Sequence, residues 1–150
     1  MVQKFRERSN GEGGFTLVEL LVVMLILGLL AAIAIPSFFN QRDKATDADA
    51  KASARTAQTA VETYATDNGG SYASVAVGDL RAIEETLTET AGPPERMTVT
   101  SAADTYTVTV TSDRTSGPAF SISRTAAGGI TYTCTPVSNG GCPSDGNWGE

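Results

Sequence analysis

An apolar run near the N-terminus constrains this chain more than any other feature of its sequence. From Leu20 to Ile35 no side chain is polar. A surface helix of a globular domain shows a polar side, so a run that is apolar on every face belongs in a membrane or at the centre of an assembly. As a helix, the stretch from Phe15 to Ile35 is roughly 30 Å long, which matches the hydrocarbon core of a bilayer. The sequence therefore permits a full membrane span.

Specific motifs lie on the N-terminal side of the apolar run. Three basic residues come first, at Lys4, Arg6 and Arg8. They are followed by Gly13-Gly14 and by Phe15-Thr16-Leu17-Val18-Glu19-Leu20. In these residues, and closely to about residue 40, the chain resembles the type IV pilin family. The resemblance implies a basic leader that is cut after Gly14, Phe15 as the new and N-methylated terminus, and Glu19 as the single buried acid.

The basic residues also predict the orientation of the chain in a membrane. By the positive-inside rule the N-terminus stays cytoplasmic, and everything after Pro36 lies outside. A conventional secretory signal is the alternative, because Ala32-Ile33-Ala34 offers an A-x-A cleavage pattern. The Gly-Gly pair and Glu19 disfavour this alternative, since a disposable signal gains nothing from an acid in hydrocarbon. We expect the cytoplasmic membrane before assembly and an extracellular pilus afterwards.

Glu19 is the acid that this apolar segment carries. An unpaired carboxylate in hydrocarbon is costly, so such a residue usually has a partner or a function. On a helix it faces the same side as Phe15, whose α-amine is free after a cut at Gly14. In one interpretation Glu19 neutralises the amine of its own chain, which opposes the helix dipole. In the other, which the resemblance implies and which we favour, it pairs with Phe15 of a neighbouring subunit and sets the axial stagger.

Gly28 and Pro36 are the weak points of the predicted helix. Proline removes a backbone donor and clashes with the carbonyl four residues back, so Pro36 is expected to bend the helix near residues 32–36. Gly28 is either a close-packing position between helices or, with Pro36, one end of a stretch that loses helical hydrogen bonds during assembly. The second role is what the resemblance to pilins implies.

Composition limits the rest of the chain to one modest domain. Without residues 1–14, the number of Lys and Arg falls from 11 to 8 and that of Asp and Glu from 17 to 15, which leaves a formal net charge of −7. An acidic product of this kind disfavours nucleic acid as a partner. Histidine is absent and the only cysteines are Cys134 and Cys142, so His-based catalysis and the usual zinc sites are excluded, and no metal or other cofactor is expected. Behind an export-type N-terminus, the Cys pair predicts one disulfide.

The helix is expected to continue as an alanine-rich segment to about Thr66, where Asp67-Asn68-Gly69-Gly70 ends it. Five positions share one face at helical spacing: Ala50, Ala54, Ala57, Val61 and Tyr64. The stretch 37–49 lacks so clear a stripe, and its charged residues are expected to meet solvent or other subunits. These residues are Arg42, Asp43, Lys44, Asp47 and Asp49.

A second helix and four strands are predicted after a glycine-rich loop. Gly78-Asp79 is expected to cap a helix over Leu80–Thr88, and Pro93-Pro94 are expected to stop it. The residues at helical spacing in this segment are Leu80, Ile83, Glu84 and Leu87. The strands expected from alternation are Arg96–Ser101, Thr105–Thr111, Ala119–Ser123 and Ile130–Cys134. The apolar face of these strands is expected to pack against the apolar stripe on the long helix. The fold class is α+β: a long helix with a protruding hydrophobic N-terminal half, packed by its C-terminal half on a small antiparallel sheet.

The C-terminal tail is rich in Gly, Ser and Asn, and it is not expected to order itself by burial alone. A bridge between Cys134 and Cys142 closes a short loop and contributes on the order of 2–3 kcal/mol. Three residues suggest calcium ligands, as in the pseudopilins of secretion machines: Asp145, Asn147 and Glu150. Their spacing matches no tight oxygen-ligand loop, so turns are favoured and no metal site is predicted.

These features predict four segments: a leader over 1–14, a membrane or filament-core helix over 15–36, its amphipathic continuation over 37–67, and a globular head with a C-terminal disulfide loop over 68–150. The leading function is a structural one, a type IV pilus subunit cut after Gly14 and polymerised through its N-terminal helix. The alternatives are a pseudopilin of a type II secretion or DNA-uptake system and a monomeric membrane-anchored binding module. An enzyme is disfavoured because no nucleophile motif or acid pair is present.

The same resemblance implies the partners. They are further copies of the chain in a helical homopolymer, a prepilin peptidase, an inner-membrane assembly platform, and the membrane itself before assembly.

Overall fold

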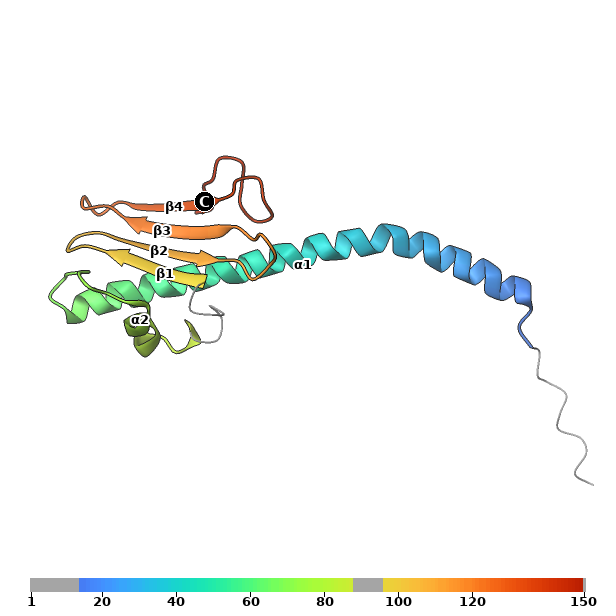
Figure 1. Ribbon diagram of the computed structural model, residues 1–150, viewed down its shortest axis with the longest axis horizontal. Helices are drawn as coiled ribbons and strands as arrows, with labels where there is room; N and C mark the ends of the chain where they lie inside the picture. The colour runs from blue at the N-terminus through green and yellow to red at the C-terminus, as the bar shows by residue number, and fades with distance from the viewer. Residues whose placement is uncertain (1–13, 88–95, 150) are drawn as a thin grey trace, which may run out of the picture. The chain divides into compact units, whose positions relative to one another are not determined.

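One long helix and a meander of four strands make up most of the fold in this computed structural model, which describes residues 14–87 and 96–149. In chain order the elements are α1 (Leu17–Asp67), α2 (Val77–Ile83), β1 (Met97–Ser101), β2 (Tyr106–Thr111), β3 (Ala119–Arg124) and β4 (Ile130–Thr135) (Figure 1). The chain divides into two units, Met1–Phe38 and Phe39–Glu150. The predicted α+β class and four strands are confirmed.

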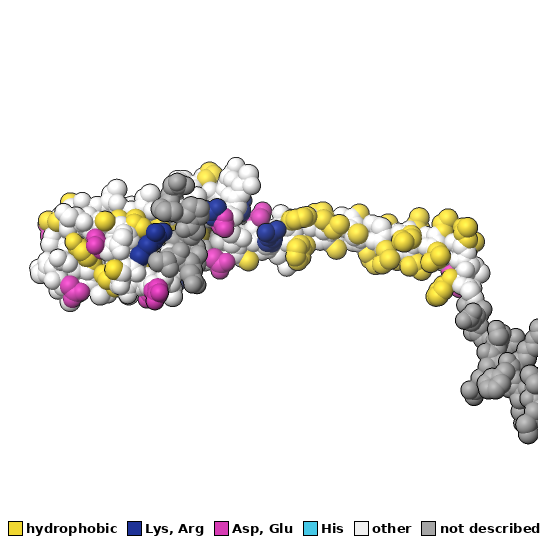
Figure 2. All heavy atoms as spheres, turned by 60° about the horizontal axis from the view of Figure 1, so that its bottom comes forward, with side chains coloured by type: hydrophobic (Ala, Val, Ile, Leu, Met, Phe, Trp, Pro, Cys, Tyr) yellow, Lys and Arg dark blue, Asp and Glu magenta, His cyan; other side chains and the backbone are white. Residues whose placement is uncertain are grey.

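The first unit holds the apolar part of α1. Its large side chains are all exposed, from 45% for Val22 to 80% for Phe15. Figure 2 shows this apolar surface along the helix. The helix continues through Gly28 and Pro36. The expected bend near residues 32–36 stays a prediction, as does the leader, of which only Gly14 lies within the described residues.

In the second unit, α1 buries its alanine stripe. Ala54, Ala57 and Val61 are fully buried, whereas Tyr64 is only partly buried. Small side chains let a sheet approach the helix closely, and alanine costs nothing in helix propensity. The helix ends as predicted: the N–H of Gly70 donates to the carbonyl of Ala65 at 2.7 Å, and Gly69 and Gly70 have φ of +68° and +88°. Glycine adopts this left-handed conformation without steric cost.

The strands form one antiparallel sheet in the order β1-β2-β3-β4. Alternation sends their apolar residues inward, and Val108, Phe120 and Ile122 are fully buried against the stripe of α1. The other face carries hydroxyl side chains. Thr107 bonds to Ser123 at 2.9 Å and Thr109 to Ser121 at 2.8 Å between their Oγ atoms. The predicted meander and its two faces are therefore confirmed.

The short helix α2 differs from its prediction. It runs from Val77 to Ile83 rather than from Leu80 to Thr88, and Thr88, Pro93 and Pro94 lie outside the described residues. The reason is the role of Asp79, whose Oδ2 accepts the N–H of Ala76 at 2.9 Å from within the first turn. Asp79 thus caps the helix from inside and moves its start three residues toward the N-terminus.

The C-terminal tail is held by more than its disulfide, which joins Cys134 to Cys142 as the sequence predicts. Trp148 is only 5% exposed and packs edge-on against Phe120 and Tyr132, with ring centroids 5.6 and 5.2 Å away. The expectation that burial does not order the tail was wrong, because this one indole supplies a large buried area.

Backbone pairing extends the tail along the outer edge of β4. The N–H of Cys134 donates to the carbonyl of Gly146 at 2.8 Å, and Asn147 forms an antiparallel bridge with Thr133. The tail therefore covers part of an edge that otherwise exposes unpaired backbone groups.

Candidate functional site: the N-terminal helix

The first turn of α1 is closed by Thr16 and Glu19. The N–H and the hydroxyl of Thr16 both donate to Oε2 of Glu19 at 2.9 Å, and the N–H of Glu19 donates to the Thr16 hydroxyl at 3.2 Å. This is a reciprocal capping box, in which the two side chains satisfy donors that have no partner inside the helix. It brings the carboxylate of Glu19 back toward the residue that follows Phe15.

Sequence reasoning missed Thr16. The signal was present as Thr16-Leu17-Val18-Glu19 before an apolar run, which is the usual sequence pattern of a capping box. The geometry adds one detail to the predicted role of Glu19. Within the described residues only Oε2 accepts hydrogen bonds, so Oε1 is open to a further donor.

The remaining predicted site residues are spread along α1 and into the second unit. Gly28 and Pro36 lie further along the helix, and a Cβ added at Gly28 would meet nothing within 4 Å. Cys134 and Cys142 lie in the other unit. The structure therefore places Gly14, Phe15 and Glu19 within one short stretch and does not bring the other predicted residues to them.

By length and composition α1 is the one helix among the described residues that is suited to cross a membrane. Hydrophobic side chains surround it in the first unit, without the polar side that a helix on a domain surface shows. A segment of this kind needs lipid or other apolar helices around it.

No group of three or more metal-ligating side chains gathers in residues 14–87 and 96–149. In the tail, Oδ1 of Asp145 accepts the N–H of Asn147 at 3.0 Å, and Oδ1 of Asn147 accepts the N–H of Gly149 at 3.1 Å. These oxygens form the turns that the sequence favoured over calcium ligation. Glu150 lies outside the described residues.

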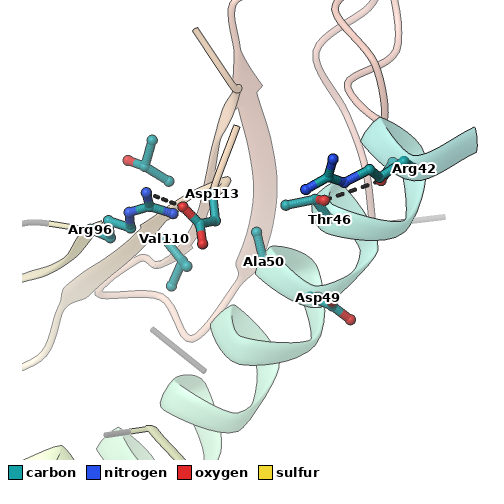
Figure 3. A pocket seen from close by; sticks show the side chains of 8 residues that line it. Arg42, Thr46, Asp49, Ala50, Arg96, Val110 and Asp113 are labelled. Atoms are coloured by element: carbon teal, nitrogen blue, oxygen red, sulfur yellow. Dashed lines mark hydrogen bonds and ion pairs between the residues drawn. The ribbon is translucent and has the colours of Figure 1, made fainter. Parts of the chain in front are cut away.

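A pocket of about 320 Å³ lies between α1 and the end of β2 (Figure 3). Arg96 and Asp113 point toward each other across one wall and form an ion pair, and Asp49 points away from them. The described residues of the lining include no histidine or cysteine, and the ion pair joins the residue before β1 to the loop after β2, so these contacts are read as packing between segments.

Asp47 corrects the prediction for the charged stretch 37–49. It was expected to meet solvent or other subunits, yet it is 0% exposed. Its carboxylate is bonded to Ser112, Arg114 and Gly141, which come from two loops of the second unit. An ionised group can be buried when its oxygens are paired in this way.

Known proteins resemble the N-terminal part of this chain. Residues 9–35 match a family model described as the prokaryotic N-terminal methylation motif. The type IV major pilin protein PilA of Myxococcus xanthus is 38% identical over 63 residues, which is 42% of this chain and 27% of that protein. The type II secretion system core protein G of Klebsiella michiganensis is 30% identical over 88 residues, 59% of this chain and 58% of that protein. The competence protein ComGC of Halalkalibacterium halodurans is 35% identical over 57 residues, 38% and 56% of the two chains.

The chain thus spans between 27% and 58% of the length of these relatives. The family model includes Gly14, Phe15, Glu19 and Gly28 and ends one residue before Pro36. No solved structure matches the chain.

Proposed function

Because this chain belongs to the type IV pilin-like family, we propose that it is the structural subunit of an extracellular type IV pilus. In this proposal, copies of the chain polymerise through the N-terminal part of α1. The family matches also support the prediction of a structural rather than an enzymatic role.

The observation that carries the proposal is the exposed apolar surface that begins at Phe15 and continues along α1 to Phe38. Each Leu, Ile, Val or Phe side chain that is removed from water contributes about 1.5–3 kcal/mol. Before assembly a bilayer covers this surface, which is consistent with the length of the helix. Outside a bilayer, a bundle of the same helix from many copies covers it, and repetition of one contact along a screw axis produces a filament.

Processing in this proposal follows from the first residues of the segment. A prepilin peptidase cuts between Gly14 and Phe15, where an added Cβ at Gly14 would meet no atom of the described residues within 4 Å and a glycine leaves the backbone accessible. The new amine of Phe15 becomes methylated. In the filament this amine pairs with Glu19 of a neighbouring subunit, for which the open Oε1 atom is available. Gly28 and Pro36 delimit the stretch that loses helical hydrogen bonds on assembly.

Purified surface filaments test both assembly and processing. We expect imaging to show long filaments, and mass spectrometry to find a subunit that begins at methylated Phe15 and contains no leader. A mature protein that begins at Ile35 would indicate a conventional signal peptide and overturn the proposal. Recovery of the protein only as membrane-bound monomers would instead favour an anchored binding module.

A second candidate function is that of a pseudopilin in a secretion or DNA-uptake system. The similarity to type II secretion core protein G and to ComGC supports it. Both functions share the membrane before assembly, the peptidase and an inner-membrane assembly platform. Short rods confined to the cell envelope, in place of filaments on the cell surface, would favour the pseudopilin.

A further inference from the structure

Asp47 lies at the centre of a polar cluster in the second unit, formed by Asp47, Ser112, Arg114, Asn139 and Gly141, of which Asp47 and Ser112 are buried and the others partly buried. Four donors reach its carboxylate. Oδ1 accepts the Ser112 hydroxyl at 2.5 Å and Arg114 Nε at 2.9 Å, and Oδ2 accepts Arg114 Nη2 at 3.2 Å and the N–H of Gly141 at 2.7 Å. The cluster thus ties three parts of the chain together: α1, the loop between β2 and β3, and the disulfide loop.

The bonds converge on the turn that carries Cys142. Arg114 Nη2 donates to Oδ1 of Asn139 at 2.6 Å, and the carbonyl of Asn139 accepts the N–H of Cys142 at 3.0 Å. Gly141, which directly precedes Cys142, is bonded to Asp47 directly. Two residues of the turn that leads into Cys142 are therefore held by the cluster.

The two glycines of this turn fit the close approach of the carboxylate. Gly140 has φ +58°, and a Cβ there would overlap both Asp47 and Arg114. At Gly141 an added Cβ would lie 2.9 Å from the Cβ of Asp47. Any larger residue would push the turn away from α1, so the backbone of the turn is shaped to the carboxylate.

Cys134 is positioned by other means. It lies in β4 opposite Phe120, and its N–H donates to the carbonyl of Gly146. Neither contact involves the Asp47 cluster. The two sulfur atoms are therefore brought together by two separate sets of bonds, of which one depends on Asp47.

We propose that Asp47 is a positioning residue for formation of the Cys134–Cys142 disulfide. In the reduced chain it holds the turn at residues 139–142 against α1, so that the thiol of Cys142 rests beside that of Cys134 before oxidation. This role does not depend on whether the chain forms a pilus.

The oxidation itself needs a two-electron oxidant, and a disulfide, glutathione disulfide, serves as the probe. One cysteine thiolate attacks a sulfur of glutathione disulfide and releases one glutathione thiolate. The other cysteine then attacks the mixed disulfide, forms the bond between Cys134 and Cys142, and releases the second glutathione. The two protons of the protein thiols end on the two glutathione molecules, and the protein loses two electrons to the oxidant.

The test measures the equilibrium constant of this exchange for the full-length protein in detergent micelles. The oxidised fraction at graded ratios of glutathione to glutathione disulfide is determined by thiol alkylation and mass spectrometry. We expect Asp47→Ala to lower the constant at least tenfold, because the turn loses its bond to α1. Asp49→Ala, an exposed carboxylate two residues further along the same helix, is the matched control and is expected to leave it unchanged.

A second control separates positioning from general stability. Val61→Ala removes buried volume from α1 away from the cluster, and it is expected to change the constant less than twofold while the protein stays folded. An unchanged constant in Asp47→Ala would overturn the proposal, as would an equal fall in Asp47→Ala and Val61→Ala.

A milder variant serves if Asp47→Ala fails to fold. Asn139→Ala removes the side-chain bonds of the turn to Arg114 and Ser116 and leaves the four donors of Asp47 in place. We expect a fall of about threefold in the exchange constant, together with faster hydrogen exchange at the Gly141 amide of the reduced protein. If Asn139→Ala leaves both values unchanged, the proposal is wrong.

Discussion

Replacing Trp148 by alanine tests how the tail is attached to the domain. The indole is 5% exposed and lies against Phe120 and Tyr132, and its Nε1 donates to the carbonyls of Ser121 and Thr133 at 3.3 and 2.8 Å. A buried Trp→Ala or Phe→Ala change typically costs 3–5 kcal/mol. We expect a loss of about 3–5 kcal/mol in the free energy of unfolding of the second unit, at the upper end if the carbonyl bonds are not replaced by water.

The variant Trp148→Phe separates packing from hydrogen bonding. It keeps an aromatic ring between Phe120 and Tyr132 but removes the N–H, so we expect a smaller loss of about 1–2 kcal/mol. Val137→Ala is the matched control in the same tail, because Val137 is exposed, and surface substitutions usually change stability by about 0.5 kcal/mol or less.

The assay is urea unfolding of the full-length protein in detergent micelles. Trp148 is the only tryptophan, so its loss removes the fluorescence signal, and near-ultraviolet circular dichroism of the tyrosines follows unfolding instead. A loss below about 1 kcal/mol for Trp148→Ala, similar to that of the exposed control, would show that the ring does not anchor the tail.

Three further predictions concern charge and the disulfide. Glu19→Ala is expected to leave processed protein in the membrane but to reduce the number of surface filaments, since each added subunit would bury an uncompensated amine; abundant filaments of normal length would refute this. Burial raises the pKa of Asp47, but hydrogen bonds from Arg114, Ser112 and Gly141 outweigh it and leave this pKa below its ordinary value. The ionised carboxylate of Asp47 therefore stabilises the folded state above its unfolded pKa of about 4, and this stabilisation is lost as the pH falls through the lower folded pKa. Unfolding measured at several pH values should detect this loss in the wild type. The loss should be absent in Asp47→Asn. Reduction of the disulfide should speed hydrogen exchange at the amides of Val137, Ser138, Ser144 and Asp145, which lie outside the turn that Asp47 holds, and leave the near-ultraviolet signal of Trp148 unchanged. Loss of that signal would mean that the bridge, not the indole, holds the end of the tail.

The sheet was predictable because its chemistry is local. In β2 threonine alternates with a buried tyrosine or valine, and this period of two assigns both the strand and its buried face. The structure places the four strands within about one residue of the predicted bounds. The end of α1 followed from the glycines after Asp67 in the same way, since their conformational freedom is a property of the residue itself.

The residues that were missed take part in contacts between distant segments. Asp47 looked like part of a solvated charged stretch because its partners, Ser112 and Gly141, lie far along the chain. A signal did exist in the sequence. The buried stripe has alternating spacings of three and four residues, and Asp47 lies three residues before Ala50, so it falls on the same face of the helix. The isolated Trp148 in a polar tail was a similar signal, because an indole is large and seldom left in solvent.

The pairing of the tail with β4 limits how this domain can join to others. Adding a strand from another copy requires free N–H and C=O groups along a sheet edge. At Thr133 and Cys134 those groups are already engaged by residues 146 and 147 of the same chain. Recruitment of a new strand along this part of β4 would first require the tail, and the indole at its end, to leave. Strand addition is therefore blocked along this part of β4, and the proposed polymerisation through helices would not have to compete with it there.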